Sequence, residues 1–487
     1  MDVKPSIKKH FNNKKITVLG LGLLGGGFNV VKFLAEQGTD ITVTDLKTEK
    51  QLKTVIKKLQ KFKNIKFVLG KHRLQDFKNR DLIIKASGVP LDSIYIKEAK
   101  KNKIPIEMDE ALFVKLARKF FKDITVIGVT GTRGKSTTTH LLFEIIKSAG
   151  KDVFLGGNVR GLATLPLLNK IKDGSIIVME LASWNLQGFG YDKISPNIAI
   201  FITFFDDHLN YYNGDRKLYF KDKSNIFKYQ KKNDFLIMPM KTKNIIAKYY
   251  DKKIFGQIRI CRMPVFAPAF AKATADKPAG ATAGRPVILS KNYGVAKWDI
   301  KIRGEHNLQN ISLAIQVAKI LGIKENVIKQ TVENFRGVSG RLEFIKEIDG
   351  VKYYNDTTST MPDSTIAALK SFDSDIILIA GGTDKNLDYK DLVKELRRRS
   401  KSVKYLILFQ GTATEKIIAE FKKQNCQVNY KLVDNMKYAV HEAKSVAEKN
   451  DVVLLSPGAA SFGIFKNEFD RGSKFIDELA LSRTNQH

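Results

Sequence analysis

The stretch GVTGTRGKSTTT, residues 128–139, has the residue types of a phosphate-binding loop. Its last two glycines permit a tight turn ahead of a helix, and the backbone amides at a helix N-terminus attract phosphate. Lys135 would add a point charge, and the hydroxyl of Ser136 could reach a magnesium ion. Val129 stands where the common nucleotide-loop pattern has glycine. The stretch therefore predicts a nucleotide-phosphate site that departs from the common pattern at one position.

A second glycine-rich turn lies near the start of the sequence, where GLGLLG places Gly20, Gly22 and Gly25 in a G-x-G-x-x-G spacing. Asp45 ends the next predicted strand. In this pattern the glycines let the backbone approach a diphosphate, and the acidic residue binds a ribose hydroxyl. The nucleotide could be NAD or another nucleotide with a diphosphate, and a purely structural turn is the third interpretation. Two such turns predict two nucleotides, one per domain, which a hydride-transfer enzyme does not need.

Three further side chains, Glu180, His208 and Lys223, indicate a functional site only when their positions in the sequence are considered. Glu180 directly follows the apolar stretch SIIVM, and His208 comes after the stretch IAIFITFF. Both would therefore lie at the carboxyl ends of predicted strands, where open α/β sheets bind ligands. Taken alone, Lys223 is one solvated lysine among many.

Stretches with the periods of strands and helices alternate along the whole chain, which predicts an α/β fold. The predicted strands cover residues 15–20, 40–45, 81–88, 123–129, 174–181, 197–205, 373–382, 404–409 and 451–458. Helices are expected at 109–121 and 137–150. We expect three consecutive domains: a Rossmann-like domain over 1–118, a central P-loop-type ATPase domain with a mainly parallel sheet over 119–336, and a C-terminal Rossmann-like domain over 337–487.

The composition limits the class of protein. Hydrophobic residues make up 43% and aromatic residues 10% of the 487 residues, which excludes a disordered chain. No apolar run reaches the ~18 residues that a membrane span needs, and the polar start MDVKPSIKKHFNNKK does not resemble a secretory signal. The two cysteines, Cys261 and Cys426, fit a reducing compartment. We expect a cytoplasmic protein without membrane contact.

The formal net charge of +33 has two interpretations. A strongly basic chain can bind nucleic acid, but basic residues recur along the whole chain and no RNA- or DNA-binding signature is present. A lysine-rich surface explains the charge without a nucleic-acid partner, and it would attract a polyanionic small substrate. Residues 263–286 are rich in alanine, proline and glycine, and they predict a mobile surface insertion without chemistry.

The loop around Lys135 resembles the ATP-binding loop of the Mur ligases, the enzymes that build the peptide of bacterial peptidoglycan. Further stretches resemble signatures of this family in the same order and cover nearly the whole chain. They are GGNVR (156–160), MELASWNLQ (179–187), DDHLNYY…KDKSNIF (206–227), GEHNLQN (304–310), SGRLE (339–343), NDTTST (355–360) and LLSPGAASFGIFKNEFDRG (454–472). The last of these stretches, together with GGTDKNLDY (381–389), is similar to the branch of the family that adds D-glutamate.

The resemblance implies an ATP-dependent amide ligase that adds D-glutamate to UDP-N-acetylmuramoyl-L-alanine in peptidoglycan precursor synthesis. UDP would lie on the first turn and ATP on the second. The alanine carboxylate would become an acyl phosphate, and the amine of D-glutamate would displace the phosphate. A Mur-type ligase with a different acceptor amino acid is one alternative. A basic nucleic-acid-binding ATPase and an NAD-dependent oxidoreductase are the alternatives from other classes, and we expect a monomer.

The resemblance also implies roles for single residues. Lys135 would hold the β- and γ-phosphates. Ser136 and Glu180 would bind a first Mg²⁺, and His208 would help to bind a second. Lys223 matches the family lysine that CO₂ carbamylates, and this carbamate would support the second metal.

The binding residues implied by the resemblance fall into three sets. The ATP site comprises Gly131, Thr132, Gly134, Lys135, Ser136, Thr137, Asn307, Asn310, Arg341 and Asp356. The site for the UDP-substrate comprises Gly20, Gly22, Leu23, Gly25, Asp45, Ser87, Gly88 and Asn158. The D-glutamate site comprises Thr360, Lys385 and Ser461. For Asn307 and Asn310, helix capping is the structural alternative.

Several positions depart from the family pattern. Arg133 replaces an asparagine in the ATP loop, and Asn185 replaces a glutamine near the substrate. Thr358 stands where many members carry a lysine, and Glu468 stands where many carry an aromatic residue. These last two changes make the amino-acid pocket less cationic, so they bear on the acceptor amino acid more than on ATP. The third domain is expected to close through a hinge near residues 335–340.

Overall fold

The computed structural model describes residues 3–22, 25–90, 92–159, 161–207, 211–261, 287–288 and 298–481. Leu23, His208 and the insertion predicted at 263–286 lie outside the described residues. The chain forms two compact units. The first unit comprises Met1–Lys297 and Gln309–Thr331, and the second comprises Trp298–Leu308 and Val332–His487.

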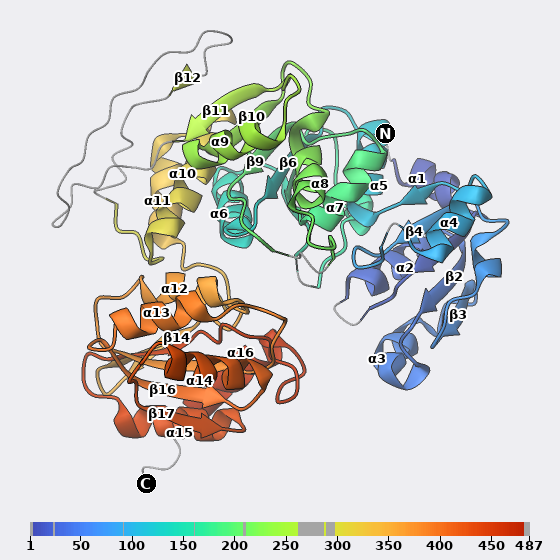
Figure 1. The fold of residues 1–487 in the computed structure, drawn as a ribbon. Helices are drawn as coiled ribbons and strands as arrows, with labels where there is room; N and C mark the ends of the chain where they lie inside the picture. The colour runs from blue at the N-terminus through green and yellow to red at the C-terminus, as the bar shows by residue number, and fades with distance from the viewer. Residues whose placement is uncertain are drawn as a thin grey trace. The chain divides into compact units, whose positions relative to one another are not determined.

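The first unit begins with a five-stranded parallel sheet in the order β3-β2-β1-β4-β5 (Figure 1). Its elements are α1 (Lys4–Phe11), β1 (Lys15–Leu19), α2 (Gly26–Glu36), β2 (Asp40–Asp45), α3 (Glu49–Leu59), β3 (Ile65–Leu69), η1 (Leu74–Phe77), β4 (Leu82–Lys85), α4 (Ile94–Lys101), β5 (Ile106–Glu107) and α5 (Asp109–Phe120). Strand β1 lies in the middle because it is apolar on both faces. Ile16 and Val18 pack into one core, and Leu19 packs into another core with Ile83.

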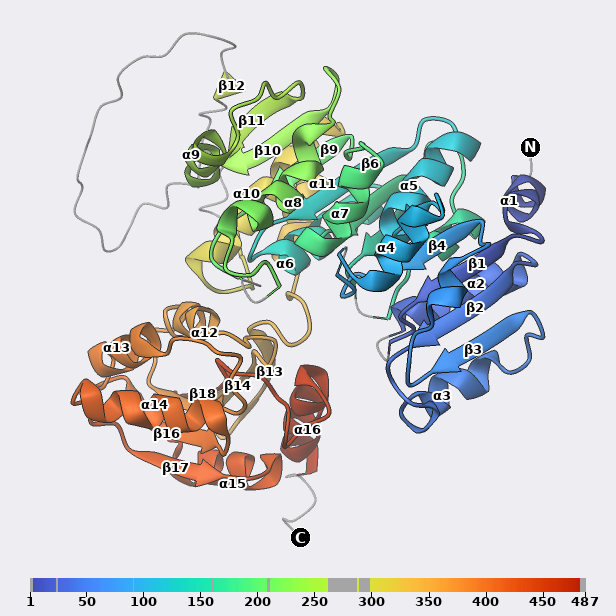
Figure 2. The ribbon, with the colours of Figure 1, turned by 45° about the vertical axis from the view of Figure 1, so that its right-hand side comes forward.

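A second sheet in the first unit has seven strands in the order β12-β11-β10-β9-β6-β8-β7, and all its neighbouring strands are parallel (Figure 2). Its elements are β6 (Thr125–Thr130), α6 (Lys135–Ser148), β7 (Val153–Gly157), η2 (Leu165–Asn169), β8 (Ile176–Glu180), α7 (Ser183–Tyr191), β9 (Ile198–Phe201), α8 (Arg216–Lys228), β10 (Phe235–Pro239), α9 (Met240–Tyr249), β11 (Gln257–Cys261) and β12 (Val287–Ile288). The loop after β6 is therefore flanked by the ends of β8 and β9. Two further helices, α10 (Glu305–Ile320) and α11 (Glu325–Asn334), belong in part to each unit.

The second unit contains a six-stranded sheet in the order β13-β14-β18-β15-β16-β17, in which β13 is antiparallel to β14 and the other pairs are parallel. Its elements are β13 (Glu343–Ile348), β14 (Val351–Asn355), α12 (Pro362–Leu369), β15 (Ile376–Gly381), α13 (Lys390–Arg398), β16 (Val403–Phe409), α14 (Thr412–Lys423), β17 (Tyr430–Val433), α15 (Met436–Val446), β18 (Val452–Leu455) and α16 (Glu468–Leu481). Alternate residues of β15 enter different cores: Leu378 packs with α12, α13 and α14, whereas Ile379 packs with α15 and α16. Helices therefore cover both faces, and α15 and α16 lie side by side (Figure 2).

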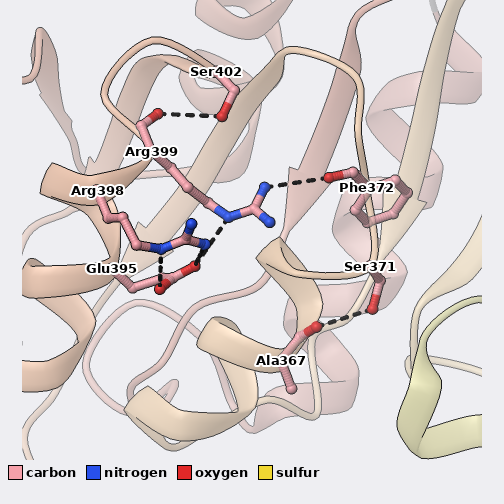
Figure 3. A network of polar contacts seen from close by, with 7 residues as sticks. All are labelled: Ala367, Ser371, Phe372, Glu395, Arg398, Arg399 and Ser402. Atoms are coloured by element: carbon pink, nitrogen blue, oxygen red, sulfur yellow. Dashed lines mark hydrogen bonds and ion pairs between the residues drawn. The ribbon is translucent and has the colours of Figure 1, made fainter. Parts of the chain in front are cut away.

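A network of ion pairs and hydrogen bonds lies at the end of α13 in the second unit (Figure 3). Arg398 donates from Nε and Nη2 to the two carboxylate oxygens of Glu395, at 3.0 and 2.6 Å. Arg399 donates to Glu395 at 2.9 Å and to the carbonyl of Phe372 at 3.2 Å. Burial alone would raise the pKa of Glu395, but the hydrogen bonds from both arginines outweigh burial and lower it. This network links α13 to the chain after α12 and contains no predicted site residue.

The α/β fold class with mainly parallel sheets is confirmed. The strand predicted at 40–45 coincides with β2, and the helix predicted at 109–121 is one residue longer than α5. The predicted domain boundaries, after residues 118 and 336, stay predictions. Among the described helices, none is long and apolar enough to cross a lipid bilayer.

Candidate active site

The predicted phosphate loop joins β6 to α6. Gly134 is the N-cap of α6 and has a φ of +86°, a left-handed conformation that favours glycine. A Cβ at this position would also overlap Oδ1 of Asn310, so Asn310 packs directly on the loop. Ser136 and Thr137 are buried in the first turn of α6. The loop therefore ends in a helix N-terminus that carries a buried hydroxyl.

Hydrogen bonds of two threonines join this loop to the chain after β9. The amide of Thr132 donates to the carbonyl of Thr203 at 2.9 Å, and Oγ1 of Thr132 accepts from the amide of Phe205 at 2.9 Å. Oγ1 of Thr203 accepts from the amide of Arg133 at 2.9 Å. The guanidinium of Arg133 lies 5.4 Å from the centre of the Phe205 ring. The protein itself therefore holds the backbone of the loop in place.

Two lysines converge on one carbonyl of the loop. Nζ of Lys135 donates to the carbonyls of Gly131 and Thr132 at 3.0 and 3.1 Å. Nζ of Lys223, which comes from α8, donates to the carbonyl of Gly131 at 3.0 Å and lies 4.9 Å from the centre of the Tyr219 ring. The loop therefore gathers two amino groups where phosphate oxygens would be expected.

Lys223 is buried, with 2% of its surface exposed. Burial is the largest cause that lowers the pKa of Lys223 well below its ordinary value of 10.5, and the charge of Lys135 lowers it further. The negative charges of Asp207, Asp222 and Glu180 oppose this shift without cancelling it. The environment therefore favours a neutral amine, which is the nucleophilic form of a lysine side chain.

Glu180 is the last residue of β8 and lies beside the phosphate loop. It is in register with Val129 of β6 and with Gly157 of β7, and it is 4% exposed. The carbonyl of Glu180 accepts a hydrogen bond from the amide of Asn158 at 2.7 Å, and the side chain of Asn158 is exposed. Glu180 and the loop that leads to Ser136 thus lie at the same carboxyl edge of the sheet.

A hydroxyl and a carboxylate are oxygen ligands that suit Mg²⁺. Within the described part of the chain, no group of three or more His, Cys, Asp or Glu side chains could hold a metal ion. A Mg²⁺ ion at this edge would therefore complete its coordination with phosphate oxygens and water, as Mg²⁺ commonly does. His208, predicted for a second Mg²⁺, lies outside the described residues.

The first glycine turn follows β1 and is bonded by the acidic residue at the end of β2. Oδ2 of Asp45 accepts from the amides of Leu21 and Gly22 at 2.9 and 3.0 Å, and Oδ1 accepts from the amide of Lys47 at 2.8 Å. Burial alone would raise the pKa of Asp45, but the backbone bonds from Gly22, Lys47 and Leu21 outweigh burial and lower it. Asp45 therefore holds the turn itself, and its ribose contact stays a prediction.

Other residues predicted for the UDP-substrate lie around this turn. Helix α2 begins after Gly25, and Nδ2 of Asn29 in α2 donates to the carbonyl of Gly161 at 2.9 Å. Gly161 lies three residues after Asn158, so this hydrogen bond joins α2 to the segment that carries Asn158. Ser87 and Gly88 follow β4, and Oγ of Ser87 accepts from Nδ2 of Asn185 at 3.1 Å. The first unit therefore gathers these predicted residues around the start of α2 and the end of β4.

In the second unit, Asp356 follows β14 and is buried. Its Oδ1 accepts from the amide of Leu342 at 3.1 Å, and its Oδ2 accepts from the hydroxyls of Ser359 and Ser456 at 2.5 and 2.7 Å. Burial raises the pKa of Asp356 to about 6, although these hydrogen bonds and the charge of Arg341 lower it. Asp356 thus fastens three segments of its own unit. The ATP contacts predicted for Asp356 and Arg341 stay predictions.

The residues predicted for D-glutamate lie on three neighbouring loops of the second unit. Thr360 follows β14, Lys385 follows β15 and Ser461 follows β18, and these strands are adjacent in the sheet. Thr383 and Ala460 exchange backbone hydrogen bonds at 3.0 Å, which joins the loops after β15 and β18. Lys385 is exposed and Ser461 is buried. The structure therefore brings these loops to one edge of the sheet.

Asn307 and Asn310 both lie on α10, but they belong to different units. Nδ2 of Asn307 donates to the carbonyl of Arg303 at 2.7 Å within the second unit. Asn310 packs on the phosphate loop in the first unit. The adenine contacts predicted for both residues stay predictions.

Two buried cations were missed by the sequence analysis. Lys85, the last residue of β4, is 1% exposed, and the signal for it was a lysine that closes an otherwise apolar strand. Arg471 is fully buried, and its guanidinium donates to the carbonyls of Thr357 and Ala459 at 2.8 and 3.3 Å. The sequence feature that could have identified it is its place in the stretch 454–472, which resembles the family.

Family models match all three parts of the chain. The model described as Mur ligase MurD-like, N-terminal domain, matches residues 14–107, and the Mur ligase middle domain matches 129–318. The model described as Mur ligase, glutamate ligase domain, matches residues 340–458. A relative from Roseiflexus sp., named UDP-N-acetylmuramoylalanine–D-glutamate ligase, is 37% identical over 476 residues, which cover 95% of this chain and 97% of that protein.

Solved structures share the fold at low sequence identity. The UDP-N-acetylmuramate–alanine ligase of Thermotoga maritima has a TM-score of 0.60 and 17% identity, and the match covers 96% of this chain and 100% of that chain. The MurF ligase of Thermotoga maritima in complex with ADP has a TM-score of 0.52 and 19% identity, and the match covers 84% of this chain and 97% of that chain. At such identities the similarity shows the fold.

Proposed function

Because the chain belongs to the Mur ligase family, we propose that it is an ATP-dependent ligase that adds D-glutamate to UDP-N-acetylmuramoyl-L-alanine in peptidoglycan precursor synthesis. The similarity to the Roseiflexus ligase over nearly the whole chain carries this proposal. The two glycine turns of the first unit support it, because a uridine substrate and ATP each need a phosphate-binding turn. The ADP named for the MurF ligase supports an adenine nucleotide on one of them.

The reaction has two steps. An oxygen of the alanine carboxylate attacks the γ-phosphorus of ATP, the bond from this phosphorus to the bridging oxygen breaks, and ADP leaves. The amine of D-glutamate then attacks the acyl carbon, inorganic phosphate leaves with the electron pair of the broken bond, and the nitrogen gives up a proton. The first step brings two anions together, so it needs concentrated positive charge.

The phosphate loop has residues suited to this first step. Lys135 exchanges its loop carbonyls for the β- and γ-phosphates, and the N-terminus of α6 adds its amides. Ser136 and Glu180 would hold a Mg²⁺ ion, which would neutralise phosphate charge when bound. Gly131, Thr132, Gly134 and Thr137 shape the loop. Both the chemistry of the donors and their shared sheet edge support this assignment.

We further propose that Lys223 carries a carbamate. The neutral amine attacks CO₂, a nitrogen–carbon bond forms and one proton is released, so that a cation site becomes an anion. Burial of Lys223 beside Lys135 supports this change, because an ammonium group on Lys223 would repel that of Lys135 at the carbonyl of Gly131, which favours the reactive neutral amine. A carbamate next to Lys135 removes this repulsion and provides oxygen ligands for a second Mg²⁺.

The UDP-substrate and D-glutamate bind to separate loops in this proposal. The UDP-substrate lies on the first glycine turn, near Ser87 and Asn158. D-Glutamate carries two carboxylates, and Lys385 and Ser461 offer a charge and a hydroxyl for them. A different acceptor amino acid is the second candidate function, because Glu468 adds a negative charge near Arg471. Burial lowers the pKa of Arg471 to about 10, and the charge of Glu468 opposes this shift.

The proposal is tested by phosphate release. Purified protein is assayed with UDP-N-acetylmuramoyl-L-alanine, ATP and Mg²⁺ against a panel of D- and L-amino acids. We expect phosphate release with D-glutamate and none without an acceptor. Release with another amino acid and none with D-glutamate would overturn the acceptor assignment. ATP turnover that needs RNA or DNA would instead support a nucleic-acid-binding ATPase.

The carbamate has a separate test. Lys223→Ala should lose most activity, and the wild-type protein depleted of CO₂ should regain activity when bicarbonate is added. Full activity of the variant, with no effect of bicarbonate, would remove the carbamate from the proposal. We also propose that the protein is a cytoplasmic monomer, and light scattering of the purified protein tests the oligomeric state.

A further inference from the structure

Lys85 is a buried lysine whose donors are all engaged by one loop. Its Nζ donates to the carbonyls of Ala86, Ser87 and Val89 at 3.1, 3.4 and 2.6 Å. A protonated lysine has three N–H donors. These three bonds use every donor, so Lys85 in this arrangement acts on the loop 86–89 and not on a ligand.

The loop that Lys85 holds lies beside the first glycine turn. Lys85 is in register with Leu19, the residue before Gly20, and the amide of Ala86 donates to the carbonyl of Leu19 at 2.9 Å. A Cβ at Gly20 would come within 2.9 Å of the Cβ of Ala86. The loop therefore packs against the turn proposed for the diphosphate, and it carries Ser87 to the same place.

Asn185 of α7 holds the side chain of Ser87 from the other side. Asn185 is 1% exposed, and its Nδ2 donates to Oγ of Ser87 at 3.1 Å and to Oε1 of Glu110 at 2.7 Å. Its Oδ1 accepts from the amide of Ala182 at 2.9 Å. Lys85 thus fixes the backbone of the Ser87 loop, while Asn185 fixes the hydroxyl.

The charges around Lys85 fit a permanent internal role. Burial lowers the pKa of Lys85 to about 8, although the charges of Glu110 and Asp222 raise it. Burial, followed by the charge of Asp109, raises the pKa of Glu110. A buried lysine is costly unless its donors are bonded. A leucine or methionine in the same strand would avoid this cost, so the lysine needs a reason beyond packing.

We propose that Lys85 is a positioning residue for the UDP-substrate, because it holds the loop that places Ser87 beside the first glycine turn. The inference rests on the proposed function for the identity of the substrate. A purely structural lysine would instead affect both nucleotide sites alike, or only the stability of the fold. The decisive measurement is therefore the separate KM of each substrate.

The test compares Lys85→Met, which keeps the length of the side chain and removes its donors, with the wild-type protein. We expect the KM for UDP-N-acetylmuramoyl-L-alanine to rise about tenfold, with the KM for ATP changed less than about twofold. Lys78→Met is the matched control, since Lys78 is an exposed lysine of the same sheet region, paired with Glu98 at 3.4 Å. This control should change neither KM.

Equal rises in both KM values, or none, would overturn the proposal. If Lys85→Met does not fold, Asn185→Leu carries the same expectation, because it removes the donor to Ser87. Hydrogen exchange in the free protein separates this inference from the proposed function. Faster exchange in the 86–89 segment of Lys85→Met is expected even if the wild type does not use the uridine substrate, and unchanged exchange would reject the role of Lys85.

Discussion

The two glycine-rich turns of the first unit resemble each other in sequence and differ in the charge that holds them. Each follows a strand inside a parallel sheet and leads into a helix. A carboxylate holds the first turn, where Asp45 accepts from the amides of Leu21 and Gly22. Lysine amino groups hold the second turn, where Lys135 and Lys223 donate to one carbonyl.

Under the proposed function, the charge at the first turn fixes the backbone of that turn, whereas the charge at the second turn acts on phosphate. In the first turn, Asp45 engages two amides, so a diphosphate would rely on the amides that begin α2. In the second turn, Lys135 donates to loop carbonyls, and under the proposed function it exchanges them for phosphate oxygens. Removing charge from the second turn should therefore lower the rate, whereas removing it from the first should lower stability.

The largest effect is expected for Lys135→Met. Loss of the point charge on the phosphates should lower kcat by roughly 10²–10³-fold, the size seen when one charge-stabilising donor is removed from an active site. Steady-state phosphate release measures it. Lys147→Met, at the exposed end of the same helix, is the control and should keep wild-type activity. A Lys135→Met protein with near-normal kcat would end the distinction between the turns.

An intermediate effect is expected for Gly134→Ala. Gly134 and Gly22 have φ values of +86° and +66°, so alanine at either position costs about 1–2 kcal/mol of backbone strain. At Gly134 the new Cβ also overlaps Asn310, whereas no described atom lies within 4 Å of a Cβ at Gly22. Gly134→Ala should therefore lose more free energy of unfolding and should raise the KM for ATP.

Chemical denaturation of both variants and their KM values for ATP test this expectation. Gly22→Ala serves as the matched comparison, because it introduces the strain without the overlap. Equal losses of stability in the two variants would show that the packing of Asn310 on the loop contributes nothing. A raised KM for ATP in Gly22→Ala would show that the first turn influences the second site.

The elements of the fold could be predicted from the sequence because they depend on local patterns. Buried parallel strands are continuous apolar runs, so β2 was found at its observed bounds, and the strand predicted at 373–382 begins three residues before β15 and ends one residue after it. The glycines of both turns were found because each turn is a short local motif between a strand and the helix that follows it. Strand order in the sheets could not be predicted from these patterns, because it depends on pairing between distant segments.

The contacts of single side chains were less predictable. The ribose contact of Asp45 stays a prediction, and the structure adds that this carboxylate accepts hydrogen bonds from the backbone of the first glycine turn. The sequence did not reveal these bonds, since the amides of Leu21 and Gly22 come from another segment of the chain. Lys85 was missed because its burial follows from the loop carbonyls around it, and those come together only in the folded chain.

The smallest effect on activity, and the sharpest test of the first turn, is expected for Asp45→Asn. The variant replaces the charge-assisted hydrogen bonds that Asp45 accepts from the turn with weaker neutral ones. The free energy of unfolding should therefore fall by about 2 kcal/mol at neutral pH, with kcat little changed. Because the folded state lowers the pKa of Asp45 from its ordinary 3.8, its stabilisation is present above that pH and is lost as the pH falls below it. The unfolding free energies of wild type and variant should therefore converge in acid. Asp40→Asn, exposed on the same strand, is the control, and a gap that stays constant with pH would show that the charge of Asp45 does not hold the turn.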